Sequence, residues 1–244
     1  MTERGRSALD RSERRLALGP SSVHWRDGAL VIEVDEWAAP PIPGRVRGTI
    51  TLTPAALTET VLDLTPDGAH RWRPFAPTAG ISVDLDTAGW RWDGHGYFDA
   101  NFGTRALEAD FDGWTWARYL RPSGGSICLY DATLRDGSRR TTALAFDPGG
   151  TAEERPPPPD APLPRTLWRL DRTTGADPSA RPRQVRSLLD APFYSRSIVT
   201  TRIDGEDVTG VHEALDLTRF RRPVVKAMLA CRIPRRPRWA RPGG

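Results

Sequence analysis

Short runs of alternating hydrophobic and polar residues, separated by glycine and proline, recur along most of the chain. In residues 29–37, Leu30, Ile32 and Val34 fall at every second position, and residues 45–54 repeat this period with β-branched side chains. A period of two places successive side chains on opposite faces of a β-strand. Both segments are therefore predicted strands, joined by the proline-rich turn between them. Further strands are expected at 58–65, 70–77, 80–94, 95–102, 112–120, 125–136, 141–150 and 166–174.

Other segments carry a different signal. Residues 1–20 are polar and basic, which favours disorder or a surface turn. Residues 151–165 are rich in proline, as in a linker or a loop that crosses one end of a barrel. Residues 197–217 are predicted to form a hairpin that turns at Asp204 and Gly205. Short helices are expected at 184–189 and 218–229.

Many short strands at regular spacing predict an all-β fold, either a barrel or a sandwich. A chain of 244 residues can form one large β-domain or two small ones, and it can bury a core without metals or disulfides. The 22 glycines and 23 prolines supply the turns that such a fold needs. This composition excludes a helical bundle.

The charge adds only a weak signal about partners. The formal net charge is +4 and the pI is about 9.6, with Lys226 as the only lysine among 35 basic residues. The basic C-terminal segment has three interpretations: a solvated tail, a contact with an anionic membrane surface through arginine and Trp239, or a nucleic-acid contact. Cys128 and Cys231 lack a CxxC neighbour and are expected to be reduced thiols, with one disulfide as the alternative. No apolar run has the length of a signal peptide core or a membrane span.

Most of the side chains that could take part in a reaction lie in residues 93–131. Tyr97, Asp99 and Asn101 alternate, so a strand would place all three on one face, and Trp114 and Trp116 share the same relation. Aromatic and carboxylate side chains interleaved in this way favour an apolar pocket in which a group is protonated. The chain has no phosphate-binding glycine loop, GxSxG elbow or HExxH motif, and its four histidines are scattered singly.

The segment GYFDANFGTRALEADFDGWTWAR, residues 96–118, resembles the acyclic carotenoid 1,2-hydratase family, also called hydroxyneurosporene synthases. The resemblance continues through SSVHWRDGALVIEVDE, PIPGRVRGTITLTP, APLPRTLWRL, APFYSRSIVTTRIDGE and VHEALDLTRFRRP, and it covers residues 20–236. It implies a lipocalin-like all-β fold with an apolar cavity. It also implies cofactor-independent addition of water to the terminal C1–C2 double bond of acyclic carotenoids such as neurosporene and lycopene.

The expected architecture is therefore all-β with lipocalin-like barrels, and two packed β-domains are one form of it, the first being short at its N-terminus. The predicted divisions are a polar segment at 1–20, a partial lipocalin-like domain at 21–88, a second lipocalin-like domain with the GYFDANFG and WTW motifs at 89–236, and a basic tail at 237–244.

The implied reaction needs a proton at C2, a tertiary cation at C1 and capture of that cation by water. A carboxylic acid is a natural proton donor, because burial beside aromatic rings raises the pKa of such a group. Electron-rich aromatic faces can stabilise the cation without trapping it. The predicted acid is Asp99 or Asp131, and the predicted cation stabilisers are Tyr130, Trp116 and Trp114. Either Asn101 or His95 is expected to hold the attacking water and accept its proton. The predicted substrate contacts are His95, Tyr97, Phe102 and Trp114.

The expected partners are an acyclic carotenoid and water, with no cofactor, metal or nucleic acid. Because carotenoids reside in bilayers, we expect a cytoplasmic protein that contacts the inner or photosynthetic membrane of a bacterium. The alternative is a lipocalin-like isoprenoid-binding or carotenoid-binding protein without catalysis.

Overall fold

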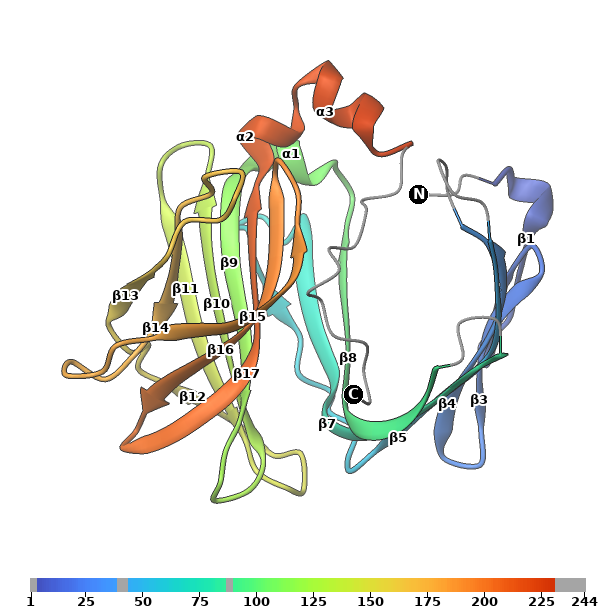
Figure 1. The fold of residues 1–244 in the computed structure, drawn as a ribbon, viewed down its shortest axis with the longest axis horizontal. Helices are drawn as coiled ribbons and strands as arrows, with labels where there is room; N and C mark the ends of the chain where they lie inside the picture. Colours follow the sequence, from blue (N-terminus) through green and yellow to red (C-terminus); the bar gives the residue numbers. More distant parts are fainter. Residues whose placement is uncertain (1–3, 39–43, 87–89, 231–244) are drawn as a thin grey trace. The chain divides into compact units, whose positions relative to one another are not determined.

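Antiparallel β-strands make up most of the protein (Figure 1). The computed structural model describes residues 4–38, 44–86 and 90–230. The first sheet has the order β1-β2-β3-β4-β5-β7-β6, with β8 paired to β7. Its strands are β1 (Leu9–Arg11), β2 (Arg15–Leu18), β3 (Ser21–Arg26), β4 (Ala29–Trp37), β5 (Arg45–Pro54), β6 (Leu62–Asp63), β7 (His70–Leu85) and β8 (Trp90–Gly103).

The second sheet has the order β12-β11-β10-β9-β17-β16-β15. Its strands are β9 (Phe111–Leu120), β10 (Ser126–Leu134), β11 (Arg139–Phe146), β12 (Ala152–Arg155), β15 (Arg183–Asp190), β16 (Tyr194–Ile203) and β17 (Glu206–Asp216). A separate ribbon pairs β13 (Asp160–Leu163) with β14 (Arg172–Gly175). The short helices are η1 (Arg6–Ala8), α1 (Leu107–Asp110), α2 (Leu217–Phe220) and α3 (Pro223–Met228).

The chain divides into two compact units, each built from segments that are distant in sequence. The first unit takes in Met1–Ala55, Thr78–Tyr97 and Ala227–Gly244, and the second takes in Ala56–Pro77 and Phe98–Lys226. The predicted domain boundary between residues 88 and 89 and the predicted basic tail at 237–244 lie outside the described residues. The whole second sheet belongs to the second unit.

The second sheet has two faces with different contents. One face packs into the core of the second unit, which contains Ala117, Tyr119, Ile127, Leu129, Ala143, Leu163, Val199, Ile203 and Val208. We call this side the core face. Because side chains alternate along a strand, the neighbours of these residues lie on the opposite side. That opposite side carries Trp114, Trp116, Tyr130 and Glu213, and we call it the aromatic face. Strand β14 contacts β9 of this sheet, and Figure 1 shows α1 and α2 at one end of the sheet.

Several predicted elements are confirmed. The strands at 29–37 and 45–54 have the predicted bounds and pair with each other. The hairpin turn falls at Asp204 and Gly205, whose φ angles of 53° and 78° fit the left-handed conformation that a two-residue hairpin turn requires. The C-terminal helical segment exists as α2 and α3, which are separated just before Pro223. The all-β prediction is thus correct.

The prediction of a helix at 184–189 is wrong, because this segment is strand β15. Val185, Leu188 and Leu189 have the spacing of a helical face. The register of β15 shifts twice against β16, between Gln184 and Arg186 and again between Ser187 and Leu189. Each shift inserts a residue and moves the next side chain to the other face, so two bulges imitate a helical period.

The strand boundaries around residue 80 are also wrong. Residues 70–85 form one strand, β7, and residues 90–103 form the next, β8, so no break occurs at 78–79 or at 94–95. Strand β7 contains prolines at positions 74 and 77. They lie between the residues that pair with β6, which end at Trp72, and those that pair with β5, which begin at Ala79. No ladder hydrogen bond to these two neighbours is therefore lost at the prolines.

Four other segments differ from their predictions. Residues 9–11 and 15–18 form a hairpin that continues onto β3, although the polar composition of an exposed edge resembles that of a disordered segment. The proline-rich segment 151–165 contains strands β12 and β13. Within 58–65 only Leu62–Asp63 is a strand, and within 166–174 the strand begins only at Arg172.

Candidate active site

Cross-strand neighbours build the aromatic face. Tyr130 of β10 lies opposite Trp116 of β9, and Trp116 lies opposite Glu213 of β17. Trp114 is two residues before Trp116 on the same face, and its ring centroid lies 6.0 Å from that of Tyr130. Tyr130 and Trp116 are both buried. Ordinary alternation along three paired strands thus gathers aromatic rings and a carboxylate on one surface.

Strand β7 supplies a further ring to this face. The fully buried Trp72 packs against Tyr130 with a centroid distance of 5.4 Å. The backbone carbonyl of Pro77 accepts hydrogen bonds from the Arg118 guanidinium at 2.6 Å and from the Ser126 hydroxyl at 3.1 Å. These contacts fix the N-terminal half of β7 against the aromatic face, within the second unit.

Asp99 and Asn101 of β8 reach the same group of rings. The Trp72 indole nitrogen donates a hydrogen bond to Asp99 Oδ2 at 2.8 Å. The Tyr130 hydroxyl donates to Asn101 Oδ1 at 3.4 Å. Both side chains contact neighbouring rings, so the predicted shared strand face is confirmed for Asp99 and Asn101. Asp99 is half-buried and Asn101 is exposed, so the carboxylate lies deeper than the amide.

Tyr130 keeps its proton throughout the physiological pH range. Burial raises the pKa of this phenol far above its usual value, and Asp99 and Glu213 raise it further when they are ionised. Tyr130 is therefore a neutral ring and a hydrogen-bond donor, and both carboxylates act on it. It occupies the centre of the cluster.

The row of rings continues to the end of the sheet where the helices lie. The Phe111 and Trp114 centroids are 5.8 Å apart, and those of His70 and Phe111 are 5.0 Å apart. His70 Nε2 lies 2.7 Å from Asp110 Oδ2, which also accepts a hydrogen bond from Arg105. The Arg105 hydrogen bond is the largest cause of the lowered pKa of Asp110, and His70 adds to it. The row of rings thus ends at the ion pair between Arg105 and Asp110, which His70 also contacts.

Asp131 follows Tyr130 in β10, so its side chain lies on the opposite side of the sheet, the core face. Its carboxylate pairs with the Arg139 guanidinium, which also contacts Asp160 Oδ2 at 2.7 Å. The Thr141 hydroxyl lies 3.3 Å from Asp131 Oδ1. Asp131 is thus held as a hydrogen-bond acceptor, and the two carboxylates considered as alternative acids belong to different surroundings.

Two cavities adjoin Asp131. A small cavity of about 20 Å³ is lined by Asp131, Thr115 and His212 together with further threonines. A more open hollow of about 340 Å³ shares Asp131 and Thr115 with it and extends to Trp114 and Leu170. His212 is fully buried, its Nε2 bonds the Thr173 carbonyl at 2.8 Å, and burial lowers its pKa to about 4. The inner cavity is therefore neutral on the His212 side and rich in hydroxyl groups.

The sequence comparison decides the family. A model of the family described as carotenoid hydratase CrtC matches residues 1–242. The chain belongs to the carotenoid hydratase family.

Named relatives agree with this carotenoid hydratase assignment. The acyclic carotenoid 1,2-hydratase of Cereibacter sphaeroides is 55% identical over 240 residues, which is 98% of this chain and 85% of the relative. That of Rhodobacter capsulatus is 52% identical with the same two coverages. That of Thiocapsa roseopersicina is 48% identical over 236 residues, 96% of this chain and 58% of the relative.

A solved structure supports the fold alone. A protein of Nitrosomonas europaea named as a candidate AttH superposes with a TM-score of 0.56 at 14% identity. The match covers 86% of this chain and 72% of the other. It confirms the lipocalin-like all-β fold that the resemblance to carotenoid hydratases implied.

The structure of this family member gathers some of the predicted site residues and separates others. Five of them lie around the aromatic face of the second unit: Asp99, Asn101, Trp114, Trp116 and Tyr130. Asp131 lies on the core face, and Phe102, which is 47% exposed, lies near the end of β8. His95 and Tyr97 belong to the first unit, where His95 is exposed and Tyr97 is half-buried.

Two residues of the aromatic face were missed. Trp72 stands in the alternating segment 70–77, so its placement on a buried strand face was predictable, but its contact with Asp99 was not. The sequence pattern indicates only that Glu213 is an exposed position of the predicted hairpin. Only the register of β17 against β9 brings it beside Trp116. In the described part of the chain, no cluster of three His, Cys, Asp or Glu residues could hold a metal.

Proposed function

We propose that the chain adds water to the terminal C1–C2 double bond of acyclic carotenoids such as neurosporene and lycopene. Two relatives that are named acyclic carotenoid 1,2-hydratases share 52–55% identity over 98% of the chain, which supports this activity. The observation that carries the mechanism is the hydrogen bond from Trp72 to Asp99, because it places a carboxyl group against the rings of the aromatic face.

Asp99 is the proposed proton donor to C2. The Trp72 indole donates a hydrogen bond to the Asp99 carboxylate, and the ring of Tyr130 packs against Trp72. A carboxyl group in such surroundings can hold a proton and deliver it to an alkene. Asp131 is the second candidate for the acid. Its pairing with Arg139 favours a role as a fixed hydrogen-bond acceptor and disfavours a role as a proton donor.

Tyr130, Trp114 and Trp116 are the proposed stabilisers of the cation at C1. The faces of aromatic rings carry partial negative charge and attract a cation without forming a bond to it. Tyr130 remains neutral, so it does not capture the cation as a phenolate would. Stabilisation of a charge that exists only after protonation lowers the barrier of the chemical step.

Asn101 is the proposed holder of the attacking water. Its Oδ1 accepts the Tyr130 hydrogen bond, which orients the amide and leaves the amide nitrogen to donate to a water oxygen. Hydration transfers no electrons, so the proposed reaction uses no cofactor. His95, Tyr97, Phe102 and Trp114 remain the proposed contacts for the hydrocarbon.

Contact with the inner or photosynthetic membrane is also proposed, because an acyclic carotenoid must leave a bilayer to react. None of the helices in the described ranges is long and apolar enough to cross a membrane. Peripheral contact would deliver one end of the polyene to the protein.

The test is incubation of the purified protein with lycopene or neurosporene in liposomes, with chromatography and mass analysis for a gain of one water. Asp99→Asn should lower hydration at least about 1,000-fold while carotenoid binding persists. Asp131→Asn should keep hydration within about tenfold of the wild type. Carotenoid binding without any product in the wild type would instead favour a non-catalytic binding protein.

A further inference from the structure

Glu213 stands in a row with the proposed site residues. It lies opposite Trp116 on β17, and Trp116 lies opposite Tyr130 on the other side of β9. Directly opposed residues in antiparallel strands have Cβ atoms roughly 5 Å apart. The three side chains therefore form one line across the aromatic face, with the carboxylate at its end.

Two neighbours hold the Glu213 carboxylate in place. The Arg196 guanidinium contacts Glu213 Oε1 through Nε at 2.7 Å and through its terminal nitrogen at 2.6 Å. Arg196 Nε also donates to the Tyr194 hydroxyl at 3.0 Å. The Glu213 side chain is 18% exposed and the Arg196 side chain is 50% exposed, so the carboxylate is the more screened of the two from bulk water. Such a pair keeps an ionised carboxylate in a fixed position.

Tyr130 lies within the electrostatic reach of two carboxylates from different strands. The pKa of its phenol, raised mainly by burial, is raised further by Asp99 of β8 and by Glu213 of β17. Asp99 contacts Trp72, whose ring packs on Tyr130. Glu213 lies opposite Trp116, which in turn lies opposite Tyr130. The aromatic face thus has one carboxyl group bonded by an indole and one paired with a guanidinium.

We infer that Glu213 is the general base that accepts the proton of the attacking water, with Arg196 as its positioning residue. This inference rests on the proposed hydration with Asp99 as the acid. Two carboxyl groups with different surroundings commonly divide the acid and base roles of one reaction. Both Arg196 contacts are made to Oε1, so Oε2 is the proposed acceptor of the water proton.

The proposed cycle conserves atoms and charge. The π electrons of C1–C2 take the proton of Asp99 and form the C2–H bond, which leaves the cation at C1. The water oxygen forms the C1–O bond, and its surplus proton moves to Glu213. The tertiary alcohol leaves, with Asp99 as the carboxylate and Glu213 as the acid. Return of one proton from Glu213 to Asp99, through the Tyr130 hydroxyl or through solvent, restores the starting state.

The test separates protonation from water capture. In heavy water, a cation that forms but is not captured returns to the alkene, and some recovered carotenoid then carries deuterium at C2. Glu213→Gln should lower hydration at least about 100-fold, while deuterium exchange stays within about threefold of the wild type. Asp99→Asn should abolish both hydration and exchange.

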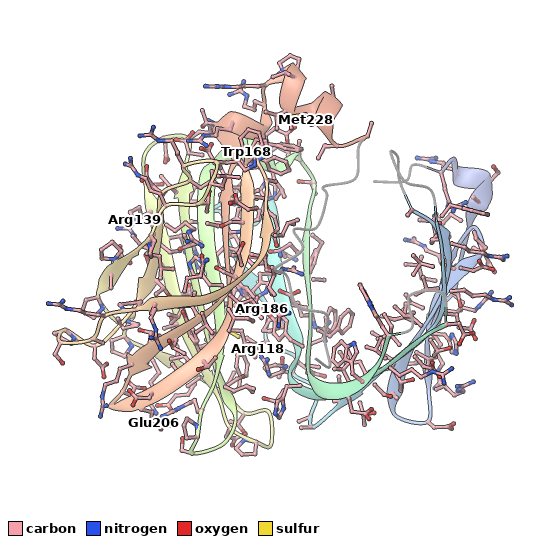
Figure 2. The ribbon with its side chains drawn as sticks, in the orientation of Figure 1. Arg118, Arg139, Trp168, Arg186, Glu206 and Met228 are labelled. Carbon is pink, nitrogen blue, oxygen red and sulfur yellow. The ribbon has the colours of Figure 1, made fainter. Side chains whose placement is uncertain are left out.

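The matched control is Glu206→Gln on the same strand. Glu206 is 23% exposed and pairs with Arg121 at 2.8 Å, but it lies at the far tip of the β16–β17 hairpin (Figure 2). Hydration by this variant should equal that of the wild type. Thermal unfolding of each variant shows whether it is folded.

Full hydration by folded Glu213→Gln would overturn the role of Glu213 and leave the Asp99 proposal standing. Loss of exchange together with hydration in that folded variant would also overturn it, because the defect would then precede water capture. Absence of both reactions in the wild type would instead defeat the proposed function itself.

Discussion

The two faces of the second sheet differ sharply, although their residues alternate along the same strands. Tyr130 and Asp131 are consecutive, yet Tyr130 lies among tryptophans and Asp131 is paired with Arg139 on the opposite side. The aromatic face is where a cation can be stabilised, while the core face combines packed aliphatic side chains with a hydroxyl-lined cavity. Pleat position, more than closeness in sequence, therefore decides which side chains share the same surroundings.

The largest expected effect concerns the core face and its buried histidine. Burial lowers the pKa of His212 to about 4, against about 6.5 in an unfolded chain. The unfolded state therefore binds more protons between these values, and His212 contributes stability above pH 6.5 that is lost as the pH falls towards 4. We expect a loss of about 3 kcal/mol over this window from His212.

Urea unfolding near pH 7.5 and near pH 4 measures this loss. His212→Gln, whose amide can donate to the Thr173 carbonyl, should lose about 3 kcal/mol less than the wild type between the two conditions. His24→Gln, in the first unit, serves as the control and should follow the wild type. Equal losses in wild type and His212→Gln would show that the core face does not exclude the imidazolium ion.

The next effect concerns the aromatic face. Trp114→Leu should lower kcat for hydration about five- to thirtyfold, because a partly desolvated cation–π contact contributes about 1 to 2 kcal/mol. Carotenoid binding should change little, since the cation exists only after protonation. The exposed Trp168 provides the control, and Trp168→Leu should keep the wild-type kcat. A rise in KM with unchanged kcat would mean that Trp114 only binds the hydrocarbon.

Much of this comparison was predictable from the sequence. The period of two in 97–101 and 114–116 correctly placed Asp99 with Asn101 and paired the two tryptophans. These relations hold within single strands, where alternation is fixed by backbone geometry. The same logic was available for Tyr130 and Asp131, because consecutive residues of a strand cannot share a face.

The contacts between strands were not predictable. Glu213 reaches Trp116 through the pairing of strands nearly 100 residues apart, and Trp72 reaches Asp99 across 27 residues. Register between distant strands depends on the whole sheet, so no local pattern encodes it. In β15 the local pattern itself was misleading, because two bulges replaced the period of a strand with that of a helix.

The smallest expected effect completes the comparison between the faces. Arg139 is about half exposed, and an ion pair of that kind contributes at most about 1 kcal/mol. Arg139→Gln should therefore lower the free energy of unfolding by no more than this amount and leave hydration unchanged, with the neighbouring Arg140→Gln as control. If Arg139→Gln instead changed kcat by more than tenfold, Asp131 would take part in the chemistry, and the separation of a reactive aromatic face from a structural core face would fail. Unchanged kcat with a small loss of stability would place the Asp131 pair among the contacts that hold the sheet together.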